Sequence, residues 1–206
     1  MTTAMTPMEI LSWMEEYKVN HLPVIEGKHY VGLLAEDDVF NLSDPEAPVS
    51  SSNSWLKKIY VKADQHLYEV VKLMTDEQIS VVPVLDASGH YLGVITRRTI
   101  IEKFATYAAV NQPGGIIILG INNRDYIASQ IVQIVESNDA KLLSLFVADQ
   151  PDSTTMDVTI KVNRQDISGI LQTFDRYGYE VKASWLDNND DYLQDRFDSL
   201  MNFLSI

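Results

Sequence analysis

The sequence contains no cysteine. This absence excludes disulfides, thiolate catalysis and cysteine-based zinc sites, and it favours a reducing, cytoplasmic location. Long apolar runs are also missing, because the run from Ile116 to Leu119 is far too short to cross a bilayer. The start, Met1–Met8, lacks the basic and apolar regions of a signal peptide. We therefore expect a soluble cytoplasmic protein that does not insert into a membrane.

Positive charge is scarce as well. The 206 residues include 16 Lys and Arg against 29 Asp and Glu, which gives a formal net charge of −13. Nucleic acids and anionic membrane surfaces require a basic face on the protein, so neither is expected as a partner. A basic pocket for a small nucleotide remains compatible with this balance, since net charge does not describe a single cleft. Hydrophobic residues make up 46% of the chain, enough for a buried core.

A repeat occupies the first half of the chain. Residues 19–34 align with residues 79–95, with one residue added in the second turn. The matching residues are Pro23-Val24 with Pro83-Val84, His29-Tyr30 with His90-Tyr91, and Gly32 with Gly93. Each copy reads as helix, strand, strand, helix.

Helix starts precede both copies. Thr6-Pro-Met-Glu9 predicts a capping box with proline in the first turn, followed by an apolar stripe of Ile10, Met14 and Tyr17. In the second copy Asp64 is the predicted N-cap, and Leu67, Val71 and Met74 form the predicted apolar stripe.

This pattern resembles the CBS domain in two tandem copies over roughly residues 1–108. The resemblance is carried by Leu22-Pro23-Val24 with Gly32-Leu33-Leu34, and by Val82-Pro83-Val84 with Gly93-Val94-Ile95-Thr96. The family usually opens each copy with a strand, but the first copy has only Met1–Met5 before its helix, so its leading strand is expected to be missing. An unrelated α/β repeat is the alternative.

The resemblance implies an adenosine nucleotide between the copies. The family signature is Gly, two apolar residues, Ser or Thr, two further residues and Asp, with the hydroxyl facing phosphate and the carboxylate accepting from the ribose. The first copy has Ala35 and Asp38 at the two key positions, whereas the second has Thr96 and Thr99. Each copy therefore keeps half of a site.

We predict that the better pocket lies in the second copy, beside two arginines. Its predicted lining is Ile59, Tyr60, Ala63, Val82, Thr96, Arg97 and Arg98, with Asp38 as the remaining ribose acid of the first copy. AMP, ADP, ATP or S-adenosylmethionine would be a regulatory ligand, and no cofactor is required. The alternative is that these are core residues and ordinary surface arginines, and that Asp38 caps a helix.

A different pattern follows Gln112-Pro-Gly-Gly115, which marks a boundary. The remaining elements read as βαββαβ, a ferredoxin-like order. After a CBS pair this order resembles an ACT domain, as in the bacterial acetoin-utilisation regulatory proteins, and implies amino-acid binding. The turn that would hold the amino acid contains Asn122, Asn123 and Arg124 but no glycine, and ordinary turn chemistry explains it equally well.

The predicted organisation is an α+β chain. It comprises a first repeat at 1–50, a second at 51–111, an ACT-like domain at 112–186, and an acidic turn with an amphipathic C-terminal helix at 187–206. No catalytic motif is present, and His21, His29, His66 and His90 lack metal-ligand spacing, so neither catalytic nor metal-binding residues are predicted.

We therefore expect a non-catalytic sensor that forms a homodimer and passes a ligand-dependent state to an unknown downstream protein. One alternative is a structural dimerisation module with degenerate sites, and another is an unrecognised small enzyme.

Overall fold

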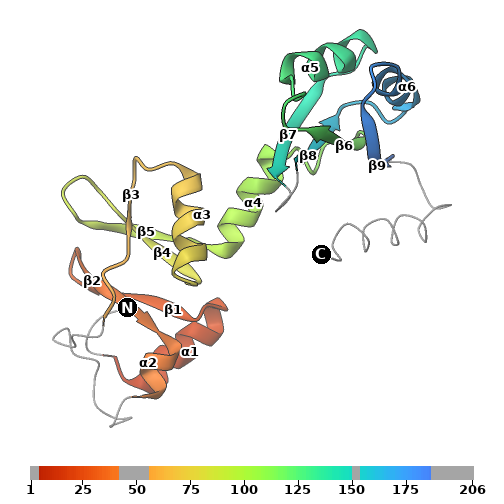
Figure 1. Ribbon diagram of the computed structural model, residues 1–206. Helices are drawn as coiled ribbons and strands as arrows, with labels where there is room; N and C mark the ends of the chain where they lie inside the picture. Colours follow the sequence, from red (N-terminus) through yellow and green to blue (C-terminus); the bar gives the residue numbers. More distant parts are fainter. Residues whose placement is uncertain (1–4, 42–55, 150–153, 187–206) are drawn as a thin grey trace. The chain divides into compact units, whose positions relative to one another are not determined.

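The computed structural model describes residues 5–41, 56–149 and 154–186 (Figure 1). The predicted acidic turn and C-terminal helix at 187–206 lie outside the described residues, as do residues 1–4. The chain divides into two compact units, Met1–Glu102 and Lys103–Ile206. Within the described ranges no helix is long and apolar enough to span a bilayer.

The first repeat consists of α1 (Pro7–Tyr17), β1 (His21–Glu26), β2 (His29–Ala35) and the short α2 (Glu36–Phe40). The predicted capping box is confirmed, because the Thr6 hydroxyl accepts from the Glu9 amide at 3.4 Å and the Glu9 carboxylate accepts from the Thr6 amide at 2.8 Å. Helix α1 ends where Lys18 takes a left-handed conformation, with φ 54°. Ile10 and Met14 are buried as predicted, but Tyr17 is not.

The second repeat consists of β3 (Val61–Lys62), α3 (Leu67–Asp76), β4 (Val81–Leu85), β5 (Tyr91–Thr96) and α4 (Arg97–Tyr107). The predicted N-cap of α3, Asp64, is wrong. His66 takes this position, with its Nδ1 accepting from the Tyr68 amide at 3.2 Å. The buried residues of α3 are Val70 and Met74, whereas Val71 of the predicted stripe is exposed and Leu67 is half-buried.

The two repeats meet through equivalent residues. Strands β1 and β2 form one antiparallel sheet, and β3, β4 and β5 form a second. His29 and His90, which occupy the same position in the two copies, form an isolated antiparallel bridge with ring centroids 6.0 Å apart. The Asn20 amide donates to Oγ of its equivalent, Ser80, at 2.9 Å. The repeats are therefore related by an approximate two-fold axis.

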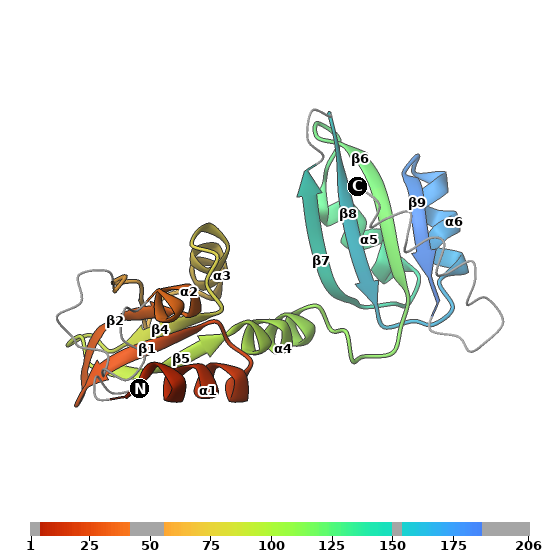
Figure 2. The same ribbon diagram turned by 90° about the horizontal axis from the view of Figure 1, so that it is seen from below.

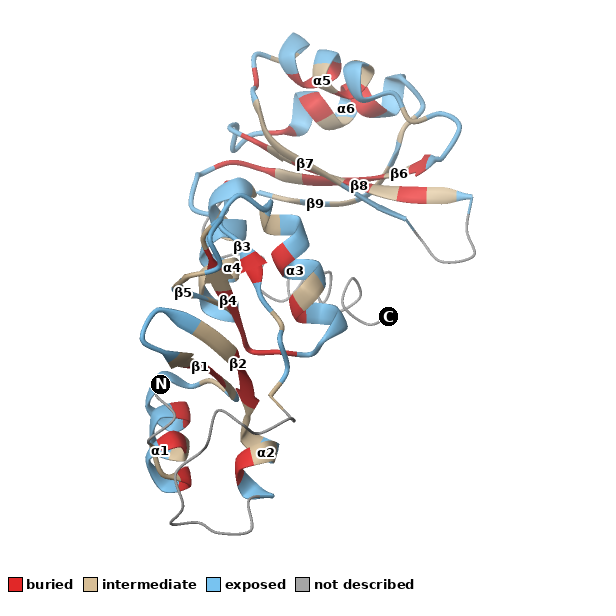
Figure 3. Ribbon diagram, turned by 90° about the vertical axis from the view of Figure 1, so that its left-hand side faces the viewer, coloured by how far each residue is buried: buried red, intermediate tan, exposed pale blue. Residues whose placement is uncertain are grey.

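The second unit is a ferredoxin-like sandwich. Its elements are β6 (Ile116–Asn122), α5 (Ala128–Ser137), β7 (Leu142–Asp149), β8 (Thr155–Val162), α6 (Ser168–Arg176) and β9 (Glu180–Trp185). The strands pair antiparallel in the order β7-β8-β6-β9 (Figure 2). Both helices cover the same face of this sheet (Figure 3). The predicted α+β class and the βαββαβ order are confirmed.

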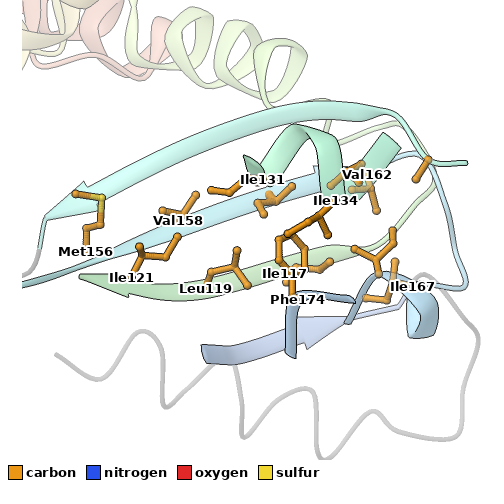
Figure 4. Packing of buried hydrophobic residues seen from close by; sticks show 14 residues of the cluster. Ile117, Leu119, Ile121, Ile131, Ile134, Met156, Val158, Val162, Ile167 and Phe174 are labelled. Carbon is orange, nitrogen blue, oxygen red and sulfur yellow. The ribbon is translucent and has the colours of Figure 1, made fainter. Parts of the chain in front are cut away.

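Alternating residues of the central strands build the core of this unit, as Figure 4 shows. Along β8 the residues Met156, Val158, Ile160 and Val162 are buried, and the residues between them are half-buried. Phe174 of α6 is completely buried against this face. Gly114, with φ 148°, allows the chain to pass the backbone of Val162, because a Cβ there would overlap the Val162 carbonyl oxygen.

Candidate functional site

A cleft of about 670 Å³ lies in the first unit, between the two repeats. The first repeat contributes Trp13, Glu16, Tyr17, Lys18, Val19, Asn20, His21, Leu22 and Pro23, and the second contributes Ser80, Val81, Tyr91, Val94, Thr96, Arg97 and Arg98. Three of the predicted site residues, Thr96, Arg97 and Arg98, are among them. The structure therefore brings the hydroxyl and the two arginines of the second repeat to the end of α1.

The lining of the cleft is cationic although the chain is strongly acidic. It carries Lys18, Arg97 and Arg98 against one acid, Glu16. Lys18 pairs with Glu15, and the Arg98 Nε lies 2.9 Å from the Glu102 Oε1, both on the exposed surface. Such pairs are weak in water. For Arg97, no ion pair or hydrogen bond of the guanidinium occurs among the described residues. An anionic ligand would supply the missing partner.

Between the repeats His21 is half-buried and contacts Ser80. The Ser80 amide donates to the His21 Nδ1 at 3.3 Å, so this nitrogen is an acceptor. The Ser80 Oγ lies 3.2 Å from the same atom. Burial lowers the pKa of His21, and the positive charges of Arg97 and Lys57 lower it further. The imidazole is therefore neutral near pH 7, and it adds a polar surface to the cleft rather than a charge.

The two halves of the family signature both act in helix capping. In the first repeat, the Asp38 Oδ2 accepts from the Ala35 amide at 3.2 Å. In the second, the Thr96 Oγ1 accepts from the Thr99 amide at 3.2 Å. A Ser/Thr-x-x-Asp signature has the form of a capping box, and each repeat retains a different half of it. Asp38 does not line the cleft.

The other predicted pocket residues lie elsewhere. Val82 is completely buried in the core of the second repeat, and the Ile59 carbonyl accepts from the Tyr30 hydroxyl at 2.6 Å. The Ala63 amide donates to the Leu85 carbonyl at 3.0 Å. Tyr60 is 44% exposed and packs edge-on against Tyr30. None of the four is part of the cleft lining that includes Thr96.

The sequence analysis did not predict that residues of α1 form one side of the cleft. Trp13 and Tyr17 line the cleft and are 40% and 62% exposed. Tyr17 fits the helical apolar period, which assigned it to the core, but it is exposed and lines the cleft. The sequence feature that could have indicated this surface is Trp13, a large aromatic residue next to the buried stripe of α1.

The turn predicted to bind an amino acid forms hydrogen bonds within itself and to a neighbouring loop residue. The Asn122 Oδ1 accepts from the Arg124 amide at 3.1 Å, and the Asn122 carbonyl accepts from the Asp125 amide at 2.8 Å. The Asn123 amide donates to the Thr154 carbonyl at 2.9 Å. Asn122, Asn123 and Arg124 are all exposed, and turn chemistry accounts for the asparagines.

A second groove, of about 590 Å³, lies between α3 and α4. It is largely apolar, and its lining residues are Val71, Met74, Thr75, Gln78, Arg97, Ile100 and Ile101. Ile101 is 68% exposed. In the part of the chain that the structure describes, no group of three or more His, Asp and Glu side chains is arranged to hold a metal ion.

Comparison with protein families gives a match to residues 56–106, which contain β3, α3, β4, β5 and most of α4. The matching family is the CBS domain. The cleft therefore lies between this matching segment and a first repeat with the same order of two helices and two strands.

Three similar proteins place the match in context. An uncharacterized protein of Methanopyrus kandleri is 26% identical over 103 residues, so this chain spans about half of that relative, 53% of its length. A CBS domain pair/ACT domain protein from Thermotoga maritima is 22% identical, with a TM-score of 0.44 over 50% of this chain and 85% of that one. CBSX2, solved in complex with AMP, is 23% identical, with a TM-score of 0.42 over 50% of this chain and 84% of that one.

Proposed function

We propose that this chain is a non-catalytic regulatory protein that binds an adenosine nucleotide in the cleft between its two repeats. The observation that carries the proposal is the cationic lining, Lys18, Arg97 and Arg98, in a chain of net charge −13. Cations that line one cleft concentrate a small anion there even when the whole protein repels it. The family resemblance supplies the expectation that the anion is a nucleotide.

The phosphates face the start of α4. Arg97 and Arg98 begin this helix of 11 residues, so its dipole adds to their charge. The Thr96 hydroxyl lies beside them and accepts from the Thr99 amide. Its Oγ1 also lies 3.1 Å from the Thr99 Oγ1, and with Thr99 as the donor of that contact the Thr96 hydroxyl donates its own proton to a phosphate oxygen. Thr99 occupies the signature position of the ribose acid, and it is not among the residues that line the cleft. We therefore expect ribose recognition to be weaker than in a complete signature.

A thermal-shift screen of the full chain with AMP, ADP, ATP and S-adenosylmethionine tests the proposal. A ligand at 100 times its dissociation constant should stabilise the protein by about 2.7 kcal/mol. Arg97→Ala and Thr96→Ala should reduce the shift. Lys62→Ala, which removes an exposed cation outside the cleft, is the matched control. Equal shifts in all variants would show that the nucleotide binds elsewhere, and no shift at millimolar ligand would refute nucleotide sensing.

The alternative function is an interaction module with degenerate sites. Two observations favour it: Asp38 and Thr96 both act in helix capping, and the groove beside α3 offers exposed apolar surface. Its partner would be a second copy of the chain or an unknown downstream protein. Light scattering at micromolar concentration should then show a dimer without any ligand, and a monomer would count against both the module and the homodimer expected for the sensor.

For the second unit we infer an ACT-like role, with an amino acid held near Asn122, Asn123 and Arg124. The ferredoxin-like strand order supports the inference, as does the resemblance to bacterial regulators with a CBS pair followed by an ACT domain. A screen of the amino acids by the same melting assay tests it. A shift abolished by Arg124→Ala would support the site, and a shift insensitive to Arg124→Ala would place the amino acid elsewhere.

A further inference from the structure

Helix α1 presents two large aromatic side chains that its own packing does not use. It buries Pro7, Ile10 and Met14. Trp13 and Tyr17 stand beside this buried stripe, 40% and 62% exposed, and both line the cleft. Large apolar rings exposed in a concave surface are typical of ligand contacts, because burying them would be favourable.

The two rings form one wall. They are four residues apart, which places them on the same side of the helix, and their centroids are 6.3 Å apart at an interplanar angle of 79°. The half-buried Tyr91 of β5 also lines the cleft. The cations Arg97 and Arg98 come from a different element, α4. The cleft therefore has an aromatic wall on α1, with Lys18 at the C-cap of that helix, and two arginines on α4.

We propose that Trp13 and Tyr17 form the base-binding wall of the cleft, against which the purine ring of the nucleotide stacks. This inference rests on the proposed nucleotide function and assigns the orientation of the ligand. The phosphates lie at α4 and the base lies at α1. Ligands with an aromatic base are preferred to bare phosphates, because an aromatic side chain gains contact with the face of any base.

The single acid of the lining lies at this wall. Glu16 adjoins Tyr17, and Lys18 follows at the C-cap of α1, so the two opposite charges offset each other here and Glu16 bears on the choice of base. A carboxylate is an acceptor only, so it pairs with an exocyclic amino group and not with a carbonyl oxygen. Adenine, with an amino group on its six-membered ring, therefore suits this end of the cleft better than hypoxanthine, which has a carbonyl there.

The test uses the full chain, with ATP and inorganic tripolyphosphate as probes in isothermal titration calorimetry. Trp13→Leu removes the ring while keeping an apolar side chain, and it should weaken ATP binding about tenfold. Tripolyphosphate affinity should not change. Arg97→Ala should weaken both probes. Trp13→Phe restores an aromatic face and should recover part of the ATP affinity. Tyr17→Leu tests the same wall if Trp13→Leu fails to fold.

Fluorescence gives an independent readout, because the chain contains only the tryptophans Trp13, Trp55 and Trp185. In a Trp55→Phe/Trp185→Phe background, ATP should quench the emission of Trp13 and tripolyphosphate should not. If Trp13→Leu and Tyr17→Leu bind ATP as tightly as the parent while Arg97→Ala does not, the base wall is wrong and the nucleotide function stands. If the parent binds no ATP, both proposals are wrong.

Discussion

Completing the broken capping box of the first repeat should stabilise the protein. In Ala35→Thr, the introduced hydroxyl stands at the N-cap of α2, three residues before Asp38. Ala35 has φ −91° and ψ 155°, the extended conformation of an N-cap, and its amide already donates to the Asp38 Oδ2 at 3.2 Å. The new hydroxyl would accept from the Asp38 amide and give the box both of its bonds.

The expected gain follows from measured N-cap substitutions. Exchanging Ala for Thr at an N-cap is worth about 0.5–1 kcal/mol, allowing for the shortness of α2, which has 5 residues. For a unit of about 100 residues this corresponds to a rise in Tm of about 2–6 °C. Scanning calorimetry of the full chain measures it, and Ala35→Val is the matched control because it has the same shape without the hydroxyl.

The complete capping box of α1 serves as a reference for the incomplete one of α2. Thr6 and Glu9 form a complete box at α1, so Thr6→Ala should lower the unfolding free energy by about 1 kcal/mol. If Thr6→Ala destabilises as expected and Ala35→Thr melts no higher than Ala35→Val, then Asp38 does not act as half of a capping box. The capping interpretation of the degenerate signature would be refuted with it.

Three further predictions concern the fold. Gly114→Ala should destabilise the protein by more than ~1 kcal/mol in urea unfolding, because its positive φ and the Val162 carbonyl oxygen leave no room for Cβ; an unchanged midpoint would contradict this packing. Phe174→Ala should cost about 3–5 kcal/mol in the same assay, since the ring is completely buried, and a cost below ~1 kcal/mol would be inconsistent with that burial. Because the pKa of His21 is lowered on folding, the unfolded state binds its proton more readily, so stability should fall as pH drops through about 6.5. His21→Asn should reduce this loss between about pH 7.5 and about pH 5.5, and an identical pH dependence would exclude His21 as a cause.

Elements with a strong local signal could be predicted from the sequence. The Thr6 cap, the repeat and the ferredoxin-like order all rest on short-range patterns that tertiary contacts reinforce. The start of α3 was misplaced by two residues because a histidine acts as its cap, a role more common for Asp or Asn. The buried valine was also misassigned, because Val70 is buried and Val71 is exposed, and adjacent apolar residues leave the packed face of a helix ambiguous.

The site was predictable only where its residues are close together in the sequence. Thr96, Arg97 and Arg98 are consecutive and line the cleft. The wall opposite them comes from the first repeat, some 80 residues earlier. Periodicity reports the direction of a side chain and not whether another element covers it, so it assigned the exposed Tyr17 to the core.

The two repeats contact each other through equivalent residues, as the two subunits of a symmetric dimer do, but here both belong to one chain. In a symmetric dimer any substitution appears twice, so both halves of every shared surface must change together. Covalent fusion removes this constraint. One copy has kept an acid and the other a hydroxyl with two arginines, whereas His29 and His90 still meet at the axis. The cleft can therefore acquire residues from one repeat that the other lacks without a compensating change at that axis.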